Sequence, residues 1–229
     1  MAIDEPTFSA LCVVYADDCL VVLDKPSGLL SVPGRGPDKQ DCLSTRVQAA
    51  YPDALIVHRL DMATSGLMVM ARGIAMQRLL SEAFAARNVV KRYEAVVMGE
   101  VEDTLDAWRV IDLPIGVDWP NRPRRVIDRV GGKPSMTRLQ RSYFDVERQV
   151  SHVVLEPLTG RTHQLRLHMQ AIGHPILGDA LYAPAEVLAM APRLQLHACE
   201  LAFAHPFSGQ PLQFSRPGLK YSGEPNPKR

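Results

Sequence analysis

The alternation of apolar runs and polar turns predicts several β-strands along this 229-residue chain. Residues 11–24 (LCVVYADDCLVVLD) contain two short apolar runs around an Ala-Asp-Asp turn, and residues 151–157 (SHVVLEP) form a further run. Residues 54–61 (ALIVHRLD) and 66–72 (GLMVMAR) are strand candidates that flank a Met-Ala-Thr-Ser turn. Residues 91–99 (KRYEAVVMG) are predicted to form another strand.

Helical patterns occur between these strands. Residues 43–51 predict a short helix that ends before Pro52. A second segment carries apolar side chains at the spacing i, i+3, i+4, i+7 and i+8, which is the stripe of an amphipathic helix. Its members are Met76, Leu79, Leu80, Ala83 and Phe84.

A third helix is predicted after residue 160, with Thr162 as its N-cap and Gly173 at the C′ position. Its apolar stripe consists of Leu165, Met169 and Ile172. Residues 25–41 are rich in Gly and Pro and are predicted to form a loop, and residues 100–141 an insertion of loops and short strands. Because strands and helices mingle without a regular βαβ alternation, we predict an α+β fold with one large sheet.

Charge is distributed unevenly, although the composition is that of an ordinary globular protein with a net charge of +1. Residues 121–141 have a net charge of +6, and residues 100–118 have a net charge of −5. A local basic face attracts phosphate whatever the total charge is. A solvated basic loop is the alternative interpretation, and the sequence leaves both open.

The four cysteines, Cys12, Cys19, Cys42 and Cys199, have neither a Cys-x-x-Cys pair nor the spacing of zinc ligands. They indicate free thiols in a reducing compartment. The N-terminal residues lack a basic segment followed by an apolar one, and no apolar run approaches the roughly 20 residues that span a bilayer. We therefore expect a cytoplasmic protein that is not inserted in a membrane.

Three polar residues at the margins of apolar elements are candidates for chemistry. Asp61 stands between a strand and a turn, Tyr93 lies in a predicted strand, and Arg166 lies in the first turns of the third helix. Each has an ordinary explanation by itself: turn formation, packing and solvation, respectively. Their significance comes from the motifs in which they occur.

Five motifs in the chain, taken together, resemble those of the RluA-type pseudouridine synthases. HRLDMATSGL at 58–67 is similar to the catalytic motif of that family, and KPSGLLSVPG at 25–34 is similar to its first motif. KRYEAVV at 91–97 resembles the tyrosine motif, and TGRTHQLRLHM at 159–169 resembles the arginine motif. HPILGD at 174–179 also matches.

The resemblance covers residues 11–215 and implies a single pseudouridine synthase catalytic domain. We expect residues 1–10 to be an N-terminal extension and residues 216–229 a flexible tail. Only 24 residues precede the KPSG motif, so we expect no S4-type RNA-binding domain before it. The implied fold is a large mixed or antiparallel sheet with flanking helices and loops around a central RNA-binding cleft.

The resemblance also implies the reaction, which is the isomerisation of uridine to pseudouridine without any metal or cofactor. Asp61 would be the catalytic acid, as an ionised carboxylate that attacks C1′ or removes a ribose proton, and the sequence does not choose between these. Arg166 would pair with that carboxylate and keep it ionised. Tyr93 would present its ring to the base and a phenol that helps to move the C5 proton.

RNA would be the partner of a monomeric enzyme. Because a stacked base is unreachable, the target must be flipped out, and Arg59 is the residue implied to fill its place. Arg161 is a further candidate for phosphate contact, with a salt bridge inside its loop as the equal alternative. Further RNA-binding candidates from the basic segment are Arg122, Arg124 and Arg125.

The motifs DWPNRP at 118–123 and APRLQLHA at 191–198 resemble one branch of the family most. The substrates implied for that branch are a tRNA anticodon stem-loop and a 23S rRNA hairpin. The histidines do not predict a metal site, because His163 and His168 are five residues apart and do not share a helix face. Two alternatives are an N-glycoside hydrolase that uses Asp61 and a non-catalytic protein that binds or remodels RNA.

Overall fold

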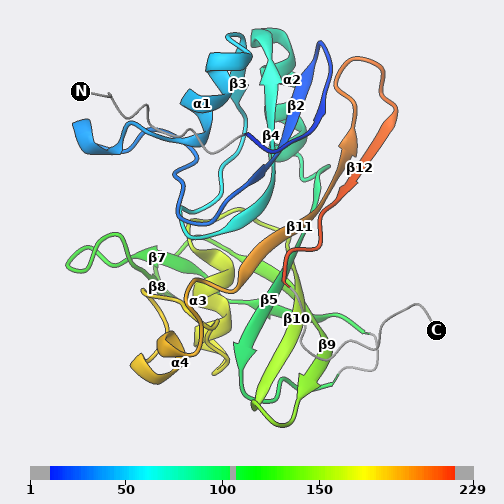
Figure 1. Cartoon of the computed structure of the whole chain (residues 1–229). Coiled ribbons are helices and arrows are strands. Elements are labelled where there is room, and N and C mark those ends of the chain that lie inside the picture. The colour runs from blue at the N-terminus through cyan, green and yellow to red at the C-terminus, as the bar shows by residue number, and fades with distance from the viewer. Residues whose placement is uncertain (1–10, 104–106, 220–229) are drawn as a thin grey trace.

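The computed structural model of the chain describes residues 11–103 and 107–219, and most of its strands join one ten-stranded sheet (Figure 1). The hydrogen-bonded order is β1-β2-β4-β11-β5-β10-β9-β6, with β3 beside β4 and β12 beside β11. β4 and β11 pair in parallel, whereas their other neighbours in this sheet are antiparallel. The sheet is therefore mixed, which confirms the predicted α+β class. Its strands are β1 (Val13–Ala16), β2 (Leu20–Lys25), β3 (Ala54–Ile56), β4 (Ser65–Arg72), β5 (Val90–Met98), β6 (Arg109–Asp112), β9 (Met136–Asp145), β10 (Val150–Pro157), β11 (Leu196–Ala204) and β12 (Pro211–Ser215).

Two helices cover opposite faces of β2 and β4. α1 (Leu43–Ala50) packs against one set of alternate side chains, including Val21 and Met68. α2 (Gly73–Ala85) packs against the other set, including Val22 and Val69. Both faces of these strands are buried, which explains why their sequences are almost continuously apolar. The helices predicted at these two positions are confirmed.

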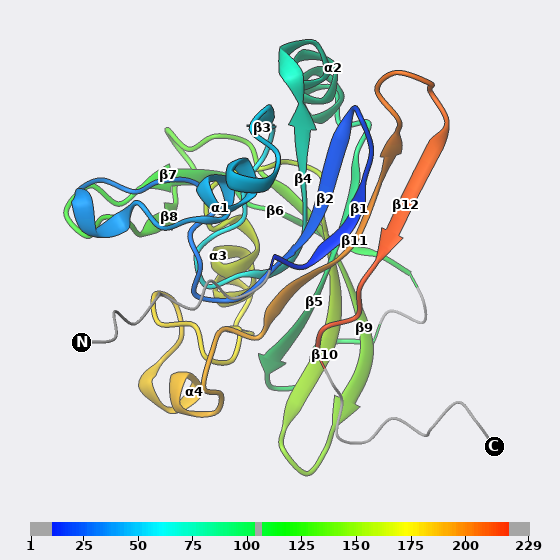
Figure 2. The same cartoon turned by 45° about the horizontal axis from the view of Figure 1, so that its top comes forward.

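The second half of the sheet carries α3 (Gln164–Ala171), whose Leu165 and Met169 pack against β5, β9 and β10. A two-stranded hairpin is formed by β7 (Ile115–Val117) and β8 (Arg125–Ile127). It lies on the same side of the molecule as α3, as two views show (Figures 1 and 2). α4 (Ala185–Ala189) follows a loop that begins after residue 171, and a 3-10 turn, η1 (Pro37–Lys39), lies in the first long loop. The helices of the described residues are all too short or too polar to span a bilayer.

The strand predicted over residues 54–61 is much shorter than expected, because β3 ends at Ile56. An antiparallel continuation would bring residue 57 opposite Val69, but the Val69 N–H instead donates to His58 Nε2 at 3.0 Å. The His58 ring also stacks on Phe84, with ring centroids 4.5 Å apart. The imidazole thus takes a hydrogen bond that a backbone carbonyl would otherwise take, and residues 57–64 leave the sheet as a loop that carries Asp61.

The segment predicted as loops and short strands over 100–141 contains the start of a long strand. β9 pairs with β10 from Thr137 to Asp145 and belongs to the main sheet. Its basic residues pair with acids: Arg138 with Glu156, and Arg141 with Glu100 and Asp103. The basic and acidic segments therefore partly neutralise each other, and the local basic face is smaller than the charge count predicted.

The N-cap of α3 is His163 and not the predicted Thr162. His163 has φ 57° and ψ 18°, a left-handed conformation in which the helix begins one residue later. The predicted Gly173 at the other end is confirmed, because it has φ 88° directly after the C-cap at Ile172. Residues 1–10 and 220–229, which include the predicted extension and most of the predicted tail, lie outside the described residues.

Candidate active site

Asp61 lies on the loop between β3 and β4, and residues of the KPSG motif form hydrogen bonds with the backbone of that loop. The Gly28 N–H donates to the Met62 carbonyl at 2.8 Å, and Ser27 Oγ donates to the Ala63 carbonyl at 2.7 Å. Lys25, which is fully buried, donates to the Met62 carbonyl at 3.1 Å through Nζ. The backbone of the two residues that follow Asp61 is thus fixed, while the Asp61 side chain keeps 26% of its surface exposed.

The Lys25 ammonium donates two further hydrogen bonds, to the carbonyl oxygens of Pro26 and Leu29. Burial lowers the pKa of Lys25 to about 8, and the nearby charge of Asp61 opposes that shift. Lys25 is therefore a cation behind the Asp61 loop whose three hydrogen-bond donors all bind backbone carbonyls. Sequence reasoning assigned no role to this lysine, although it begins the KPSG motif.

Arg166 reaches Asp61 from α3. Its Nη1 donates to Asp61 Oδ2 at 3.2 Å, while Nε and Nη2 donate to the two oxygens of Asp179 at 2.8 and 2.7 Å. The guanidinium is only 5% exposed and Asp179 only 1%. Burial disfavours the charged form of Arg166, but the two carboxylates outweigh it and raise its pKa. The predicted pair of Asp61 and Arg166 therefore forms, and Asp179 is a third member that the sequence interpretation missed.

Tyr93 lies in β5 between Leu155 of β10 and Ala198 of β11. Its ring packs against two of the hydrophobic cores, and its side chain is partly exposed. Burial, and secondarily the negative charge of Asp61, raises the pKa of the Tyr93 phenol well above its usual value. Tyr93 is therefore a neutral phenol at physiological pH, with an aromatic face and one donated proton to offer.

These three side chains line one cleft of about 740 Å³. Arg59 and Arg161 line the same cleft and are exposed. The other basic side chains at this cleft are His58, Arg87, Lys91 and His163. The cleft thus brings together five residues that were predicted from three separate motifs, although their sequence spacing did not require it: Asp61, Tyr93, Arg166, Arg59 and Arg161. The Arg161 Nε donates weakly to the Pro134 carbonyl at 3.4 Å, and Arg161 forms no ion pair with any residue that the structure describes.

The remaining RNA-binding candidates lie on the β7–β8 hairpin and its turn, and none of them lines this cleft. Arg122 stacks on the exposed Trp119, with the guanidinium carbon 3.6 Å from the ring centroid. Arg124 lies 5.7 Å from the ring centroid of Tyr182, and the Arg125 N–H donates to the Tyr182 hydroxyl at 2.8 Å. The hairpin therefore presents basic side chains outside the cleft and is tied to the protein through Tyr182.

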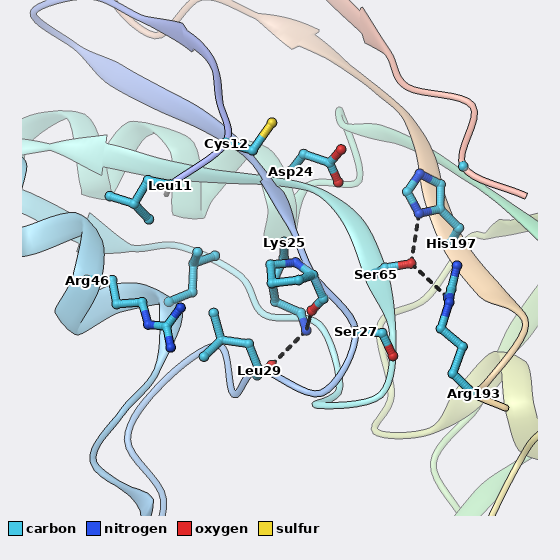
Figure 3. A pocket seen from close by; sticks show the side chains of 13 residues that line it. Leu11, Cys12, Asp24, Lys25, Ser27, Leu29, Arg46, Ser65, Arg193 and His197 are labelled. Atoms are coloured by element: carbon cyan, nitrogen blue, oxygen red, sulfur yellow. Dashed lines mark hydrogen bonds between the residues drawn. The ribbon is translucent and has the colours of Figure 1, made fainter. Parts of the chain in front are cut away.

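A second cavity, of about 550 Å³, lies beside the end of β2 (Figure 3). Ser65 forms a 2.8 Å hydrogen bond with His197 Nδ1 and accepts one from Arg193 Nη1 at 3.3 Å (Figure 3). None of the three predicted catalytic side chains lines this cavity. Three of its polar groups, Ser65, His197 and Arg193, are engaged with one another, so the first cleft is the better candidate for the reaction centre.

Within the described ranges, one group of side chains has the spacing of metal ligands: Asp17, Cys19 and His205. The Nδ1 atom of His205 accepts hydrogen bonds from the N–H groups of Phe207 and Ser208. The ring proton must therefore be on Nε2, which points at Asp17 Oδ2 at 3.1 Å. A metal ion would have to displace that proton from a ring whose other nitrogen is already occupied, so these residues do not fit a metal site.

Comparisons with known proteins point to one family. A family model described as RNA pseudouridylate synthase matches residues 19–171. The chain is 47% identical over 207 residues to the Escherichia coli "Dual-specificity RNA pseudouridine synthase RluA", with 90% of this chain and 93% of that protein covered. Its counterpart from Yersinia pestis is 48% identical over 204 residues, with 89% and 97% covered. The solved structure of "Human RNA Pseudouridylate Synthase Domain Containing 1" superposes with a TM-score of 0.75 at 28% identity, covering 94% of this chain and 86% of that one. The chain belongs to the RNA pseudouridylate synthase family.

Proposed function

We propose that this chain converts specific uridines to pseudouridine in a tRNA anticodon stem-loop and in a 23S rRNA hairpin, with Asp61, Tyr93 and Arg166 as the catalytic residues. Family membership makes the chain an RNA pseudouridine synthase. The names of its bacterial relatives state a dual specificity, which supports two classes of RNA substrate. The observation that carries the assignment of residues is the contact between Asp61 and Arg166 in the cleft that Tyr93 also lines.

In the proposed reaction the N1–C1′ bond breaks, the base turns, and a C5–C1′ bond forms. The C5 proton leaves and N1 gains a proton, so no atoms are gained or lost overall. Asp61 acts as a carboxylate, either on C1′ or on a ribose proton, and Arg166 stabilises its charge. Since the raised pKa of Tyr93 keeps its phenol neutral, we assign to Tyr93 the stacking of the base and the donation of a hydrogen bond.

The RNA is held by arginines at two distances from Asp61. Arg59 is exposed two residues before Asp61 on the same loop, a position that suits an arginine that takes the place of the flipped nucleotide. Arg161 follows Gly160 at the entrance to α3 and is assigned to a phosphate. The hairpin arginines Arg122 and Arg124 contact the flanking backbone of the RNA, with Trp119 as a platform for an unpaired base.

Several further features belong to this proposal. Residues 11–215 form the catalytic domain, and the enzyme acts in the cytoplasm as a monomer. It needs neither metal nor cofactor, since the isomerisation requires no external atom or electron. Both metal and cofactor independence are testable by dialysis against a chelator, which should leave the initial rate unchanged.

The N-glycoside hydrolase alternative requires a second carboxylate that protonates the leaving base. Asp179 is the other carboxylate that contacts Arg166, but both of its oxygens accept hydrogen bonds from the guanidinium. It is 1% exposed, so it does not reach a base bound in the cleft. The geometry therefore favours isomerisation over hydrolysis.

The decisive experiment is tritium release from 5-tritiated uridine in tRNA and 23S rRNA transcripts. We expect wild type and Asp38→Asn, an exposed carboxylate outside the cleft, to release tritium from both RNAs, and Asp61→Asn to release none. Release from only one transcript would remove the dual specificity from the proposal. Release by Asp61→Asn at the wild-type rate would refute the role of Asp61.

A further inference from the structure

Tyr182 connects the β7–β8 hairpin to the active site. Its hydroxyl lies between the Arg125 N–H of β8 and His163 Nδ1 at the start of α3, at 2.8 Å from each. The side chain is 6% exposed, and Arg166 lies over its ring with the guanidinium carbon 5.3 Å from the centroid. Asp179 Oδ1 also accepts the backbone N–H of Tyr182 at 3.2 Å. Tyr182 therefore contacts both the hairpin and the groups that surround Asp61.

The direction of these hydrogen bonds follows from their donors. A backbone N–H can only donate, so the Tyr182 oxygen accepts from Arg125. We assign its single proton to the hydrogen bond with His163 Nδ1, which then accepts it. The ring proton of a neutral His163 consequently lies on Nε2. Burial lowers the pKa of His163, which keeps the ring neutral at physiological pH.

His163 Nε2 points toward the catalytic carboxylate. It lies 3.9 Å from Asp61 Oδ2, the oxygen that accepts the 3.2 Å hydrogen bond from Arg166. A shift of about 1 Å would bring Nε2–H to normal hydrogen-bond distance. The His163 side chain is 9% exposed, so the shift is limited by its surroundings. It is therefore the hydrogen bond to Tyr182 that orients this ring.

The backbone of His163 provides independent support. Its φ of 57° is left-handed, a conformation that costs a non-glycine residue about 1–3 kcal/mol and is found mainly at functional sites. In an N-cap position, an extended conformation with a Ser, Thr, Asp or Asn side chain is the usual arrangement. His163 makes no side-chain capping bond. Its side chain instead points to Tyr182 and Asp61.

We propose that His163 and Tyr182 are positioning residues that fix the Asp61 carboxylate and link its orientation to the hairpin that docks RNA. When RNA binds Arg122 and Arg124, it shifts β8. The hydrogen bond from the Arg125 N–H to Tyr182 then carries that shift to the His163 ring. The Arg125 Nε is buried and lacks a hydrogen-bond partner in the described part of the chain, so this strand has a donor left to satisfy when the RNA docks. The inference rests on the proposed role of Asp61.

Two amide substitutions of His163 separate its two nitrogens. The Gln side chain places an N–H near the position of Nε2, whereas the Asn side chain places an oxygen near Nδ1. We expect His163→Gln, which keeps a donor for Asp61 but loses the acceptor for Tyr182, to lose about tenfold in kcat, and His163→Asn and His163→Ala to lose up to about 100-fold, since a misplacement of about 1 Å has that effect. RNA affinity should change less than about twofold in all three. His174→Gln, outside the cleft, is the control.

Tyr182→Phe removes only the hydroxyl and tests the link to the hairpin. We expect a fall in kcat of about tenfold with unchanged RNA affinity. The double variant Tyr182→Phe/His163→Asn should lose little more activity than His163→Asn alone, because both substitutions remove the same hydrogen bond. Tyr143→Phe, half-exposed on β9, is the matched control. Thermal unfolding of each variant identifies those that are merely destabilised.

A spectroscopic measurement does not depend on activity. Long-range ¹H–¹⁵N spectra of the histidine rings should give the Nε2–H tautomer for His163 in wild type, and a changed tautomer or line width in Tyr182→Phe. The proposal is overturned if His163 has the Nδ1–H tautomer, or if His163→Asn is more active than His163→Gln. If Asp61→Asn remains active, the proposed function of Asp61 fails instead, whatever these variants do.

Discussion

The two carboxylates on Arg166 are predicted to have different effects on stability when each is changed to its amide. In Asp179→Asn, Oδ1 still accepts from Arg166 Nη2, Leu181 N and Tyr182 N, but the new NH₂ group replaces Oδ2. Two donors, that amide and the Arg166 Nε–H, then face each other at the former 2.8 Å contact. In Asp61→Asn, by contrast, one 3.2 Å hydrogen bond weakens at a side chain that is 26% exposed.

The magnitudes follow from burial. Breaking a buried ion pair from one side costs about 3–5 kcal/mol of unfolding free energy, because it leaves an uncompensated buried charge. For a chain of this size that is a fall in Tm of about 6–20 °C. The exposed contact of Asp61 contributes about 1 kcal/mol or less. We therefore expect Asp179→Asn to lose both stability and activity, and Asp61→Asn to lose activity only.

Urea unfolding followed by circular dichroism measures the first quantity, and tritium release measures the second. The m-value should stay constant across the three proteins, so that the midpoints report stability directly. The reasoning would be refuted by an Asp179→Asn protein as stable as wild type. It would equally be refuted by an Asp61→Asn protein destabilised as much as Asp179→Asn, since then exposure would not separate the two roles.

Three further predictions concern acid stability, sheet packing and RNA binding. Burial lowers the pKa of His58 to about 3, so below about pH 6.5 this histidine takes up a proton in the unfolded chain but not in the folded one. The free energy of unfolding of wild type should therefore fall by about 1.4 kcal/mol per pH unit relative to His58→Gln between pH 6.5 and 5, as measured by urea unfolding. A Cβ at Gly66, where φ is 112°, would collide with the backbone of β11, so Gly66→Ala should lower Tm strongly, while Gly160→Ala, with open space around its Cβ, should not. Arg124→Ala should reduce the slope of log affinity against log salt by about 0.7–0.9 in filter binding, whereas Arg138→Ala, whose guanidinium pairs with an acid, should leave it unchanged.

Each of these has a clear contrary result. Parallel pH curves for wild type and His58→Gln would mean that the buried ring is protonated as readily as in the unfolded chain. A Gly66→Ala protein with the Tm of wild type would mean that β4 and β11 separate without cost. Equal salt slopes for Arg124→Ala and wild type would remove the hairpin arginine from the RNA interface.

Most elements of the fold were predictable from the chain because their side chains follow regular apolar patterns. The hairpin of β1 and β2, the helices α1 and α2, and the strands β4, β5 and β10 were all predicted at or near their observed bounds. The prediction was wrong where a side chain replaces a backbone group in a hydrogen bond, and where the charged residues of a strand resembled those of a solvated loop. The His58 ring ends β3 early, and the paired arginines of β9 made a sheet strand resemble a solvated insertion.

The site was predictable only through the motifs. Period and spacing placed Asp61, Tyr93 and Arg166 at the margins of elements, but the resemblance to a family was needed to join them. His163 and Tyr182 were not recognised, because their roles depend on a hydrogen bond between residues 19 positions apart. A histidine before a helix and a tyrosine in a loop are common, and neither pattern indicates that a hydroxyl bridges β8 to α3.

Asp61 and Asp179 show why the division of labour in this site required the fold. In the sequence the two look alike, since each lies in a motif in which an apolar residue comes shortly before the acid. Both contact Arg166, so contact alone does not separate them either. Exposure separates them. Asp179, which is 1% exposed, binds the Arg166 guanidinium with both oxygens and offsets the cost of burying it, whereas Asp61, which is 26% exposed, contacts it through a single oxygen. Because Asp179 already binds Nε and Nη2 of Arg166, the role that we propose for the third contact, from Nη1, is to orient Asp61 for a reaction at the ribose.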